Sequence, residues 1–388
     1  GGKILFLVID GVGGAPDPES RFTELETARL CNFDALAARS SVGRISLLPR
    51  GWTPGSGPGH LSLFGYDPLS IDFGRGVLEA LGSEYTLAPG EIAARGNFCT
   101  VDKSGRVTDR RAHQPSDEKC RALCAKLSET VRLTSGEFQL LPGKEHRFTL
   151  VLRGSNLGAQ LNDSDPQVEG LAPLPIQGKD PASERSARFV EEFLDRGRRA
   201  LAAEPHANGM LLRGFSKLPP IEPFLERYRL RAAALAVYPM YRGVARLVGM
   251  DVLDAGHSFK EQLQAARQAW NDYDYFYLHV KEADMAGHAG DFQKKVAVLE
   301  ALDGELPQLL DLGAEVVVIT GDHSTPCMHR EHSWHPVPLI LHSRYSLPVT
   351  GTTFSERGVL PGELGTFPAQ ELMTLALAHA GRLDKYGA

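Results

Sequence analysis

The sequence predicts an α/β fold with a smaller α+β domain inserted into it. Three observations lead to this fold class. Several short apolar segments, rich in β-branched residues, have the composition of strands that are buried on both faces of a sheet. Segments with a helical spacing of apolar residues lie between those strands. The middle of the chain is richer in turns and charge, and strands of the buried type resume only after it.

Each of three predicted strands is followed by an acidic residue. The strands are expected at Lys3–Ile9, Tyr273–Val280 and Glu315–Thr320, and the acidic residues beyond their ends are Asp10, Asp284 and Asp322. Helices are expected at 257–270 and 292–309, where apolar side chains recur at spacings of three and four. Because α/β folds bind ligands beyond the carboxyl ends of their strands, these acidic residues lie where chemistry is expected.

The inserted domain is predicted to run from residue 83 to residue 230. Pro-Gly pairs and a long turn-rich segment mark it. It still contains an expected strand at Phe148–Leu152 and an expected helix at Pro181–Ala203. Since the next strand of the buried type is at Ala232–Val237, residues 1–82 and 231–388 are expected to form one discontinuous domain around the insertion.

Composition and charge exclude several classes of protein. The 42 basic and 48 acidic side chains give a net charge of −6 with no basic tract, which argues against a nucleic-acid partner. No apolar stretch approaches the roughly 20 residues of a membrane helix, and no signal peptide is recognisable, so we expect a cytoplasmic protein. Five cysteines without paired spacing argue against a disulfide framework and a zinc ribbon. The sequence contains no legible indication of oligomeric state.

The histidines suggest metal binding. Seven of the 13 lie between residues 279 and 342. Asp284 and His288 are four residues apart, which places them on one face of a helical turn. Further candidate ligands are Asp322, His323 and His332, with His329 and His335 as alternatives. Each residue alone has an ordinary structural explanation, but together they favour a site for two ions of Zn²⁺, Mn²⁺ or Fe²⁺, of the kind that clamps phosphoryl oxygens.

A candidate nucleophile follows a turn rich in glycine and proline. Ser56 precedes an apolar segment with helical character and would lie near a helix N-terminus, where free N–H groups favour phosphate. Metal coordination would lower the pKa of its hydroxyl group. Thr53 and Ser62 are alternatives in the same segment.

Several segments, spread in order over nearly the whole chain, resemble one enzyme family. The sequence is similar to the archaeal-type cofactor-independent phosphoglycerate mutases, which belong to the alkaline phosphatase superfamily. The similar segments are Asp10–Gly11, Pro54–Pro68, Gly74–Gly82, Asn97–Asp102, Asp109–Arg111, Leu150–Gly154, His279–His288, Thr320–Cys327 and His332–Ser333.

The resemblance implies a fold, a reaction and a set of ligands. The fold would be an alkaline-phosphatase-like sheet with helices on both faces, carrying the metal site, and the insertion would bind substrate. One divalent ion would be held by Asp10, Ser56, Asp322 and His323, and the other by Asp284, His288 and His332. The ions would be Mn²⁺ or Zn²⁺, with Mg²⁺ and Fe²⁺ as alternatives, and 2,3-bisphosphoglycerate would not be required. Ser56 would carry the phosphoryl group between 3-phosphoglycerate and 2-phosphoglycerate. His279, His329, His335 and His342 would then lie outside the site.

The resemblance also implies contacts to the substrate. Arg110, Arg111 and Arg153 match basic residues of the insertion, and arginine suits both phosphate and carboxylate. Lys281 would contact a phosphate oxygen or only flank the metal loop. Asp163 and Asp165 match another family segment without a role that chemistry assigns.

One departure from the family leaves two other functions open. Gly57 follows the nucleophile, where the family commonly has an acidic residue. A phosphatase or phosphomutase that acts on another small phosphate ester is therefore the first alternative. A protein that binds phosphorylated metabolites without turnover is the second.

Overall fold

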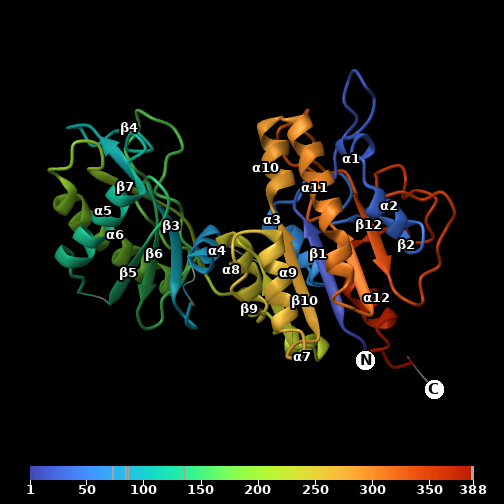
Figure 1. Cartoon of the computed structure of the whole chain (residues 1–388). Helices are drawn as coiled ribbons and strands as arrows, with labels where there is room; N and C mark the ends of the chain where they lie inside the picture. Colours follow the sequence, from blue (N-terminus) through green and yellow to red (C-terminus); the bar gives the residue numbers. More distant parts are fainter. Residues whose placement is uncertain (72–73, 84, 86, 135, 386–388) are drawn as a thin grey trace. The chain divides into compact units, whose positions relative to one another are not determined.

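The computed structural model describes residues 1–71, 74–83, 85, 87–134 and 136–385, and it divides into two compact units (Figure 1). The larger unit comprises Gly1–Ile71 and Ile221–Ala388, and the smaller comprises Asp72–Pro220. The boundaries therefore lie about ten residues before those expected at 82/83 and 230/231. Helix α4 (Arg75–Gly82) belongs to the smaller unit because it packs against strands β3 and β7 of that unit.

The larger unit is built on an eight-stranded mixed sheet with β1 near its centre. The strand order is β13-β2-β12-β11-β1-β10-β8-β9. The bounds are β1 (Ile4–Ile9), β2 (Ser41–Ser46), β8 (Ala232–Leu235), β9 (Asp251–Val252), β10 (Tyr275–Val280), β11 (Val316–Thr320), β12 (Val337–His342) and β13 (Gly365–Pro368). Strand β12 is antiparallel to β11 and to β2, whereas the other pairs are parallel. The predicted α/β class is confirmed, as are the strands expected to precede the acidic residues.

Register at the centre of the sheet positions the site. Ile9 of β1 lies beside Val280 of β10, and Val8 lies beside Thr320 of β11. All residues of β1, β10 and β11 are buried, and successive side chains of a strand point to opposite faces, so both faces of the central sheet are covered. The three parallel strands therefore end at the same edge of the sheet.

Helices of the larger unit contact this sheet and one another. They are α1 (Glu24–Thr27), α2 (Cys31–Ala37), α3 (Ser56–Leu63), α7 (Phe224–Tyr228), α8 (Pro239–Leu247), α9 (Phe259–Gln268), α10 (Glu282–Ala289), α11 (Phe292–Leu310) and α12 (Leu372–His379), with a short 3₁₀ turn, η1 (Ala369–Glu371). The helices predicted from spacing correspond to α9 and α11. No helix among the described residues combines the length and hydropathy that crossing a bilayer requires.

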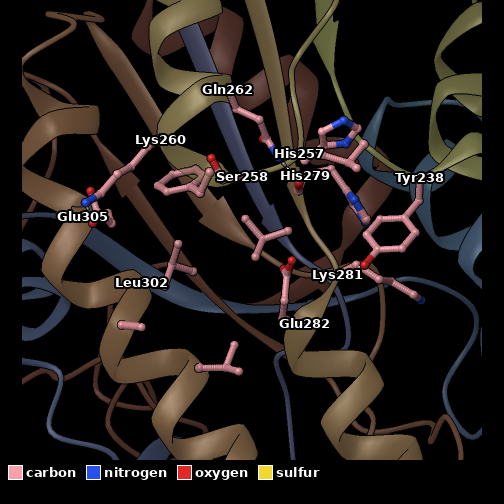
Figure 2. Close-up of a pocket in the computed structure, with 15 residues that line it drawn as sticks. Tyr238, His257, Ser258, Lys260, Gln262, His279, Lys281, Glu282, Leu302 and Glu305 are labelled. Carbon is pink, nitrogen blue, oxygen red and sulfur yellow. Dashed lines mark hydrogen bonds and ion pairs between the residues drawn. The ribbon is translucent and has the colours of Figure 1, made fainter.

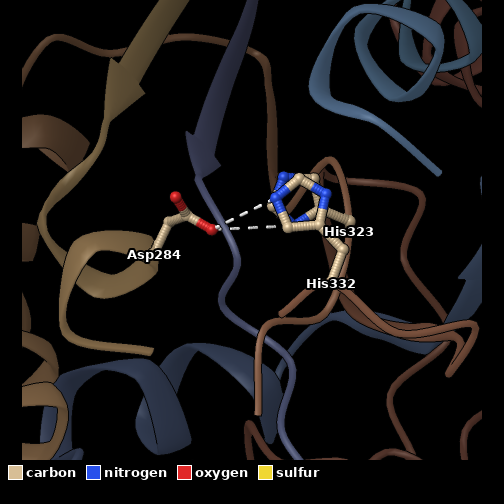
Figure 3. A group of neighbouring side chains, drawn as sticks. All are labelled: Asp284, His323 and His332. Atoms are coloured by element: carbon tan, nitrogen blue, oxygen red, sulfur yellow. Dashed lines mark ion pairs between the residues drawn. The ribbon is translucent and has the colours of Figure 1, made fainter. Parts of the chain in front are cut away.

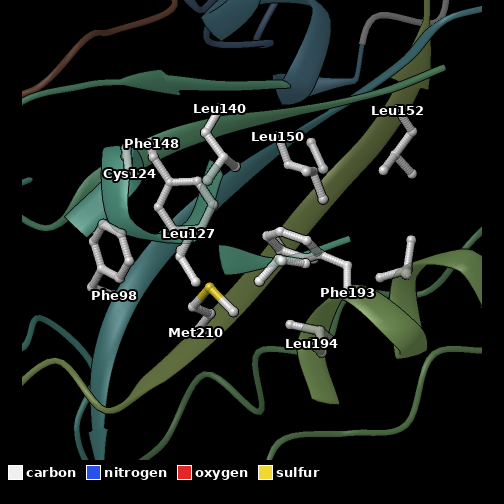
Figure 4. Close-up of a cluster of buried hydrophobic side chains, with 14 of the residues drawn as sticks. Phe98, Cys124, Leu127, Leu140, Phe148, Leu150, Leu152, Phe193, Leu194 and Met210 are labelled. Atoms are coloured by element: carbon white, nitrogen blue, oxygen red, sulfur yellow. The ribbon is translucent and has the colours of Figure 1, made fainter. Parts of the chain in front are cut away.

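The smaller unit is an antiparallel sheet with the helices Asp117–Thr130 and Pro181–Leu201 on one face and α4 beside β3 and β7. Its strands are β3 (Ile92–Val101), β4 (Val107–Asp109), β5 (Glu137–Pro142), β6 (Arg147–Arg153) and β7 (Gly209–Lys217), and β3 pairs with β4, β6 and β7. Helices α5 (Asp117–Thr130) and α6 (Pro181–Leu201) contribute to a core that includes Phe98, Phe148 and Phe193 (Figure 4). Because side chains alternate along a strand, the other face carries Arg95, Arg147 and Arg213.

Candidate active site

Loops beyond the carboxyl ends of the three central strands bring the predicted acidic residues together. Asp10 follows β1 directly, Asp284 lies in the first turn of α10 after β10, and Asp322 lies two residues after β11. All three carboxylates are essentially buried. Gly11 allows the first of these loops to turn, because its φ of +62° is left-handed and an added Cβ would lie 2.5 Å from Thr325 Oγ1.

The first cluster consists of Asp10, Asp322, His323 and Ser56. The Nε2 atom of His323 lies 3.4 Å from Asp10 Oδ1, 3.2 Å from Asp322 Oδ2 and 3.1 Å from Ser56 Oγ. Among the described residues, Asp10 Oδ1 and Asp322 Oδ2 have no hydrogen-bond partner although both are buried. These four side chains are the ones predicted for one metal ion.

The second cluster consists of Asp284, His323 and His332 (Figure 3). Asp284 Oδ1 lies 3.7 Å from His332 Nε2 and 4.0 Å from His323 Nδ1, and the two imidazole rings stack with centroids 3.5 Å apart. His288, which was predicted as a ligand, lies beside this group: its Nε2 is 3.4 Å from Asp284 Oδ1 and its Nδ1 donates to the carbonyl of Arg330. The residues predicted for the second ion thus adjoin one another, and His323 belongs to both clusters.

Both clusters fit divalent cations by their chemistry. Burial and the charge of Asp322 raise the pKa of Asp10, but His279 and His323 outweigh them and hold that pKa below its usual value. Burial likewise raises the pKa of Asp322, and its imidazole neighbours bring it well below the usual value. Ionised, buried carboxylate oxygens without hydrogen-bond donors are costly unless a cation neutralises them. A mixed set of carboxylate and imidazole donors suits Zn²⁺, Mn²⁺ and Fe²⁺.

Ser56 is positioned by the start of helix α3. Gly55 is the N-cap, and Ser56 is the first helical residue. Gly59 allows this turn to approach the Asp322 loop, because an added Cβ would lie only 2.2 Å from the carbonyl oxygen of Asp322. The buried His60 ring joins the same two segments: its Nδ1 lies 2.8 Å from the Ser56 carbonyl oxygen and 3.3 Å from Asp322 Oδ2.

The two alternative hydroxyl groups point elsewhere. Ser62 is fully buried and donates its hydroxyl hydrogen to the carbonyl of Leu47, 2.6 Å away. Thr53 is exposed and precedes the helix. Ser56, in contrast, contacts the carboxylate and imidazole clusters through His323.

Comparison with known proteins identifies the family. Residues 37–207 match the family model described as 2,3-bisphosphoglycerate-independent phosphoglycerate mutase. Relatives named probable 2,3-bisphosphoglycerate-independent phosphoglycerate mutase include one from Thermus thermophilus, 47% identical over the whole chain and 96% of the relative, and one from Aquifex aeolicus, 45% identical over the whole chain and 97% of the relative. The chain belongs to this family.

Solved structures agree with membership of the phosphoglycerate mutase family. A cofactor-independent phosphoglycerate mutase from Thermoplasma acidophilum superposes with a TM-score of 0.79 at 27% identity, over 98% of this chain and 100% of that chain. The PH0037 protein from Pyrococcus horikoshii gives a TM-score of 0.84 at 27% identity, over 100% and 99% of the two chains. The resemblance inferred from the sequence motifs is therefore confirmed.

In this family member, Lys281 joins the two clusters. Its Nζ donates to Asp10 Oδ2 at 3.2 Å, to Asp284 Oδ2 at 2.6 Å and to the hydroxyl of Tyr241 at 2.6 Å. Burial lowers the pKa of Lys281, but the neighbouring carboxylates outweigh this effect and raise it. Lys281 therefore compensates the charge of these two carboxylates, a contact that the sequence reasoning did not foresee.

His279 was expected to lie outside the site, and this expectation has to be corrected. Its ring is buried, and its Nε2 lies 2.9 Å from Asp10 Oδ2. The signal in the sequence is one imidazole within an otherwise buried strand of apolar and aromatic residues. His335 and His342, in contrast, bond to Ser333 and Ser40 rather than to either cluster.

The structure separates the arginines that were predicted to bind substrate. Arg110 forms a bidentate pair with Asp165, at 3.1 and 2.6 Å. Arg153 lies at the far end of β6 and bonds to Glu91, Gln139 and Tyr85. Arg147 and Arg153 are six strand residues apart, or about 20 Å, which is farther than one small phosphate ester spans. Arg111 is exposed beside Arg110.

The sequence reasoning missed a group of arginines on one face of the smaller unit. Arg95 on β3 pairs directly with Arg213 on β7, and Arg147 lies on the same face of the sheet. Burial lowers the pKa of Arg95, Glu79 opposes that effect, and the positive charges of Arg147, Arg75 and Arg213 lower it further. Like charges directly opposite each other are unfavourable unless an anion compensates them, and here Glu79 lies beside Arg95 and Asp163 beside Arg213. Single arginines at alternating positions of apolar strands were the available signal.

A separate cavity of about 370 Å³ lies in the larger unit beside the end of β10 (Figure 2). Segments from α9, α11 and the first turn of α10 line it, including Phe259, Gln262 and Leu302. His279 and Lys281 also border it, whereas Ser56 and Asp322 do not. The cavity thus lies next to His279 and Lys281, which contact Asp10, and not at Ser56.

Proposed function

We propose that the protein interconverts 3-phosphoglycerate and 2-phosphoglycerate without 2,3-bisphosphoglycerate, and that Ser56 carries the phosphoryl group. The observation that carries this proposal is the position of Ser56 Oγ, 3.1 Å from His323 Nε2 and at the start of α3, in a chain that belongs to the mutase family. The first turn of a helix presents free N–H groups that favour a phosphate. We place the activity in the cytoplasm, where unpaired cysteines such as the five of this chain persist.

Two divalent ions, Mn²⁺ or Zn²⁺ with Mg²⁺ or Fe²⁺ as alternatives, complete the proposed site. Asp10, Ser56, Asp322 and His323 would hold one ion, and Asp284, His288 and His332 would hold the other. When bound, such ions neutralise phosphoryl oxygens and lower the pKa of a coordinated hydroxyl group. The unpartnered oxygens of Asp10 and Asp322 support this assignment.

The chain's own residues account for the steps of the transfer. Ser56 Oγ loses its proton and attacks the phosphorus of 3-phosphoglycerate, and the bond from phosphorus to the C3 oxygen breaks. The C3 oxygen takes up a proton, which leaves glycerate beside phospho-Ser56. After the glycerate turns, its 2-hydroxyl oxygen attacks the same phosphorus and loses its proton, the bond from phosphorus to Ser56 Oγ breaks, and Ser56 Oγ takes up a proton. Lys281 keeps a positive charge next to Asp10 and Asp284 throughout.

The smaller unit is the proposed substrate-binding domain, and the larger unit is the proposed catalytic domain. Arg95, Arg147 and Arg213 share one face of the sheet of the smaller unit; Glu79 lies 3.7 Å from Arg95, and Asp163 and Asp165 lie 3.3 and 3.6 Å from Arg213. Guanidinium groups bind carboxylate and phosphate through paired hydrogen bonds. Arg110 and Arg111 remain candidates, because Asp165 links Arg110 to Arg213. Arg153 is too far along β6 to join them.

A direct assay tests the proposal. The purified protein, loaded with Mn²⁺ and given 3-phosphoglycerate, should form 2-phosphoglycerate in the absence of 2,3-bisphosphoglycerate, as followed by ³¹P NMR. Ser56→Ala should abolish the conversion and retain substrate binding. Full metal loading without conversion would refute the mutase activity.

Gly57 gives a second candidate function, transfer of the phosphoryl group to water. It is buried as the second residue of α3, where the family resemblance leads us to expect an acidic side chain. Release of inorganic phosphate from a panel of small phosphate esters, without isomerisation, would favour this phosphatase or a related phosphomutase. Binding of the esters without any reaction would favour the third possibility, a protein that binds phosphorylated metabolites without turnover.

A further inference from the structure

We propose that His279 is a positioning residue that directs one oxygen of Asp10 toward the first metal ion. This inference rests on the proposed metal site. Asp10 Oδ2 accepts from two donors, His279 Nε2 at 2.9 Å and Lys281 Nζ at 3.2 Å. Asp10 Oδ1 has no hydrogen-bond partner among the described residues and lies 3.4 Å from His323 Nε2. One oxygen is therefore occupied, and the other faces the proposed ligands.

The chemistry of the contact fixes the proton on His279. An ionised carboxylate only accepts hydrogen bonds, so Nε2 of the ring must carry the hydrogen. The other ring nitrogen, Nδ1, is buried and has no partner among the described residues, so nothing at that position calls for a second proton. A neutral imidazole with its hydrogen on Nε2 satisfies the contact. Such a partner orients a ligating carboxylate and leaves its second oxygen free for the cation.

The fold holds the ring in place. His279 lies on β10 beside Val8 of β1, two residues before Asp10, so strand pairing sets the spacing of the two side chains. Its ring stacks on that of Tyr241 with centroids 3.7 Å apart and an interplanar angle of 24°. Gln262 donates to the backbone carbonyl of His279 at 2.9 Å. The ring cannot turn without disturbing this packing.

Lys281 does not replace this role. Its ammonium group is shared among Asp10, Asp284 and Tyr241 and sits on a flexible side chain that is 18% exposed. It supplies charge to both clusters, whereas His279 contacts only the first. Loss of His279 should therefore affect one metal ion and not the other, a selectivity that a purely structural role in the core would not produce.

The test measures metal binding rather than turnover. Isothermal titration with Mn²⁺ should show two ions bound by the wild-type protein. His279→Phe preserves a buried aromatic ring and has the adjoining cavity for its extra volume, but it lacks the donor. We expect His279→Phe to lower the affinity for the first ion by about 10- to 100-fold and to leave the affinity for the second ion unchanged. His279→Gln, which retains an N–H donor, should restore most of the loss.

Two background variants assign the loss to a site. In Asp284→Asn, which impairs the second site, His279→Phe should lower the remaining affinity. In Asp10→Asn, which impairs the first site, it should have no effect. His342→Phe, a half-buried histidine of the same unit that bonds to Ser40, is the matched control and should bind both ions normally.

Each outcome bears on one proposal. Three results would overturn the positioning role of His279. They are an equal loss of affinity for both ions, a loss that also occurs in the Asp10→Asn background, and wild-type affinity in His279→Phe. If His279→Phe does not fold, His279→Gln still provides a test. Because this variant retains an N–H donor, a loss of affinity for the first ion in it would also overturn the positioning role. A wild-type protein that binds fewer than two ions would refute the proposed metal site itself.

Discussion

Gly59 offers a sharp test of how Ser56, the proposed nucleophile, is positioned. In the Gly59→Ala variant the new Cβ would lie 2.2 Å from the carbonyl oxygen of Asp322, whereas carbon and oxygen normally approach to about 3.3 Å. Helix α3 and the Asp322 loop would have to separate by about 1 Å. The position of the Cβ atom is fixed by the backbone, and the carbonyl oxygen is itself a backbone atom, so no side-chain rotation relieves the clash. Ser56 and Asp322 would move apart with them.

The expected effect is large because catalytic geometry tolerates little displacement. A misplacement of about 1 Å typically costs about 100-fold in rate. We expect kcat for conversion of 3-phosphoglycerate to fall by about that factor, with KM changing little because the arginines of the smaller unit are untouched. A coupled spectrophotometric assay measures both constants, and circular dichroism checks the fold.

Gly304 provides a matched control. It lies within α11, and a Cβ added there would meet no atom within 4 Å. Gly304→Ala should leave kcat unchanged and raise stability by up to about 1 kcal/mol, because alanine is the better helix former. If Gly59→Ala retained kcat within threefold of wild type, close packing of α3 against the Asp322 loop would not be what positions Ser56.

Three further predictions concern substrate, pH and metal. Arg95→Ala should raise the KM for 3-phosphoglycerate about tenfold or more in steady-state assays, whereas Arg153→Ala should leave KM unchanged; the reverse pattern would refute the assignment of the basic face. Burial raises the pKa of Asp165, but the bond from Arg110, the backbone N–H of Gln167 and the charge of Arg213 together outweigh burial, so the folded-state pKa is lowered. The pair therefore stabilises the fold above the ordinary aspartate pKa of about 3.9 and loses this contribution as the pH falls through the lowered value. Asp165→Asn should cost about 2 kcal/mol in urea unfolding at pH 7 and less near pH 3, and a cost independent of pH would contradict the ionic pair. Removal of metal by a chelator should abolish turnover and lower the melting temperature. Adding Mn²⁺ at about 100 times its Kd should raise the free energy of unfolding by about 2.7 kcal/mol per ion. An unchanged melting temperature would contradict a metal site in the folded state.

The catalytic strands were predictable because their signals are local. A buried apolar run followed by an acidic residue predicted the positions of Asp10, Asp284 and Asp322, and parallel pairing places these ends at one edge of the sheet. The basic face of the smaller unit was not predictable in this way. Arg95 and Arg213 meet only through the pairing of β3 with β7, across more than a hundred residues of chain, and this register leaves no trace in either segment alone.

The same reason explains the histidine that was missed. Motif similarity selected Arg153 and could not show that it lies at the opposite end of β6 from Arg147. His279 had the composition of a core residue, and its contact with Asp10 follows from the alignment of β10 with β1. The insertion begins at residue 72 rather than at the predicted residue 83 because α4 packs on β3 and β7. Composition does not indicate this tertiary contact.

A buried lysine explains why the two loops of the first cluster keep their shape. Lys295 on α11 is fully buried, and its Nζ donates to the carbonyls of Gly11, Gly13 and Thr325. Gly11 and Gly13 follow Asp10, and Thr325 follows His323, so one side chain bonds to both the loop after β1 and the loop after β11. An apolar residue at this position would leave buried carbonyls unsatisfied, each at about 1–3 kcal/mol. The shape of both loops therefore depends on Lys295, a side chain of the protein itself, and its loss should disturb both loops even before any metal ion binds.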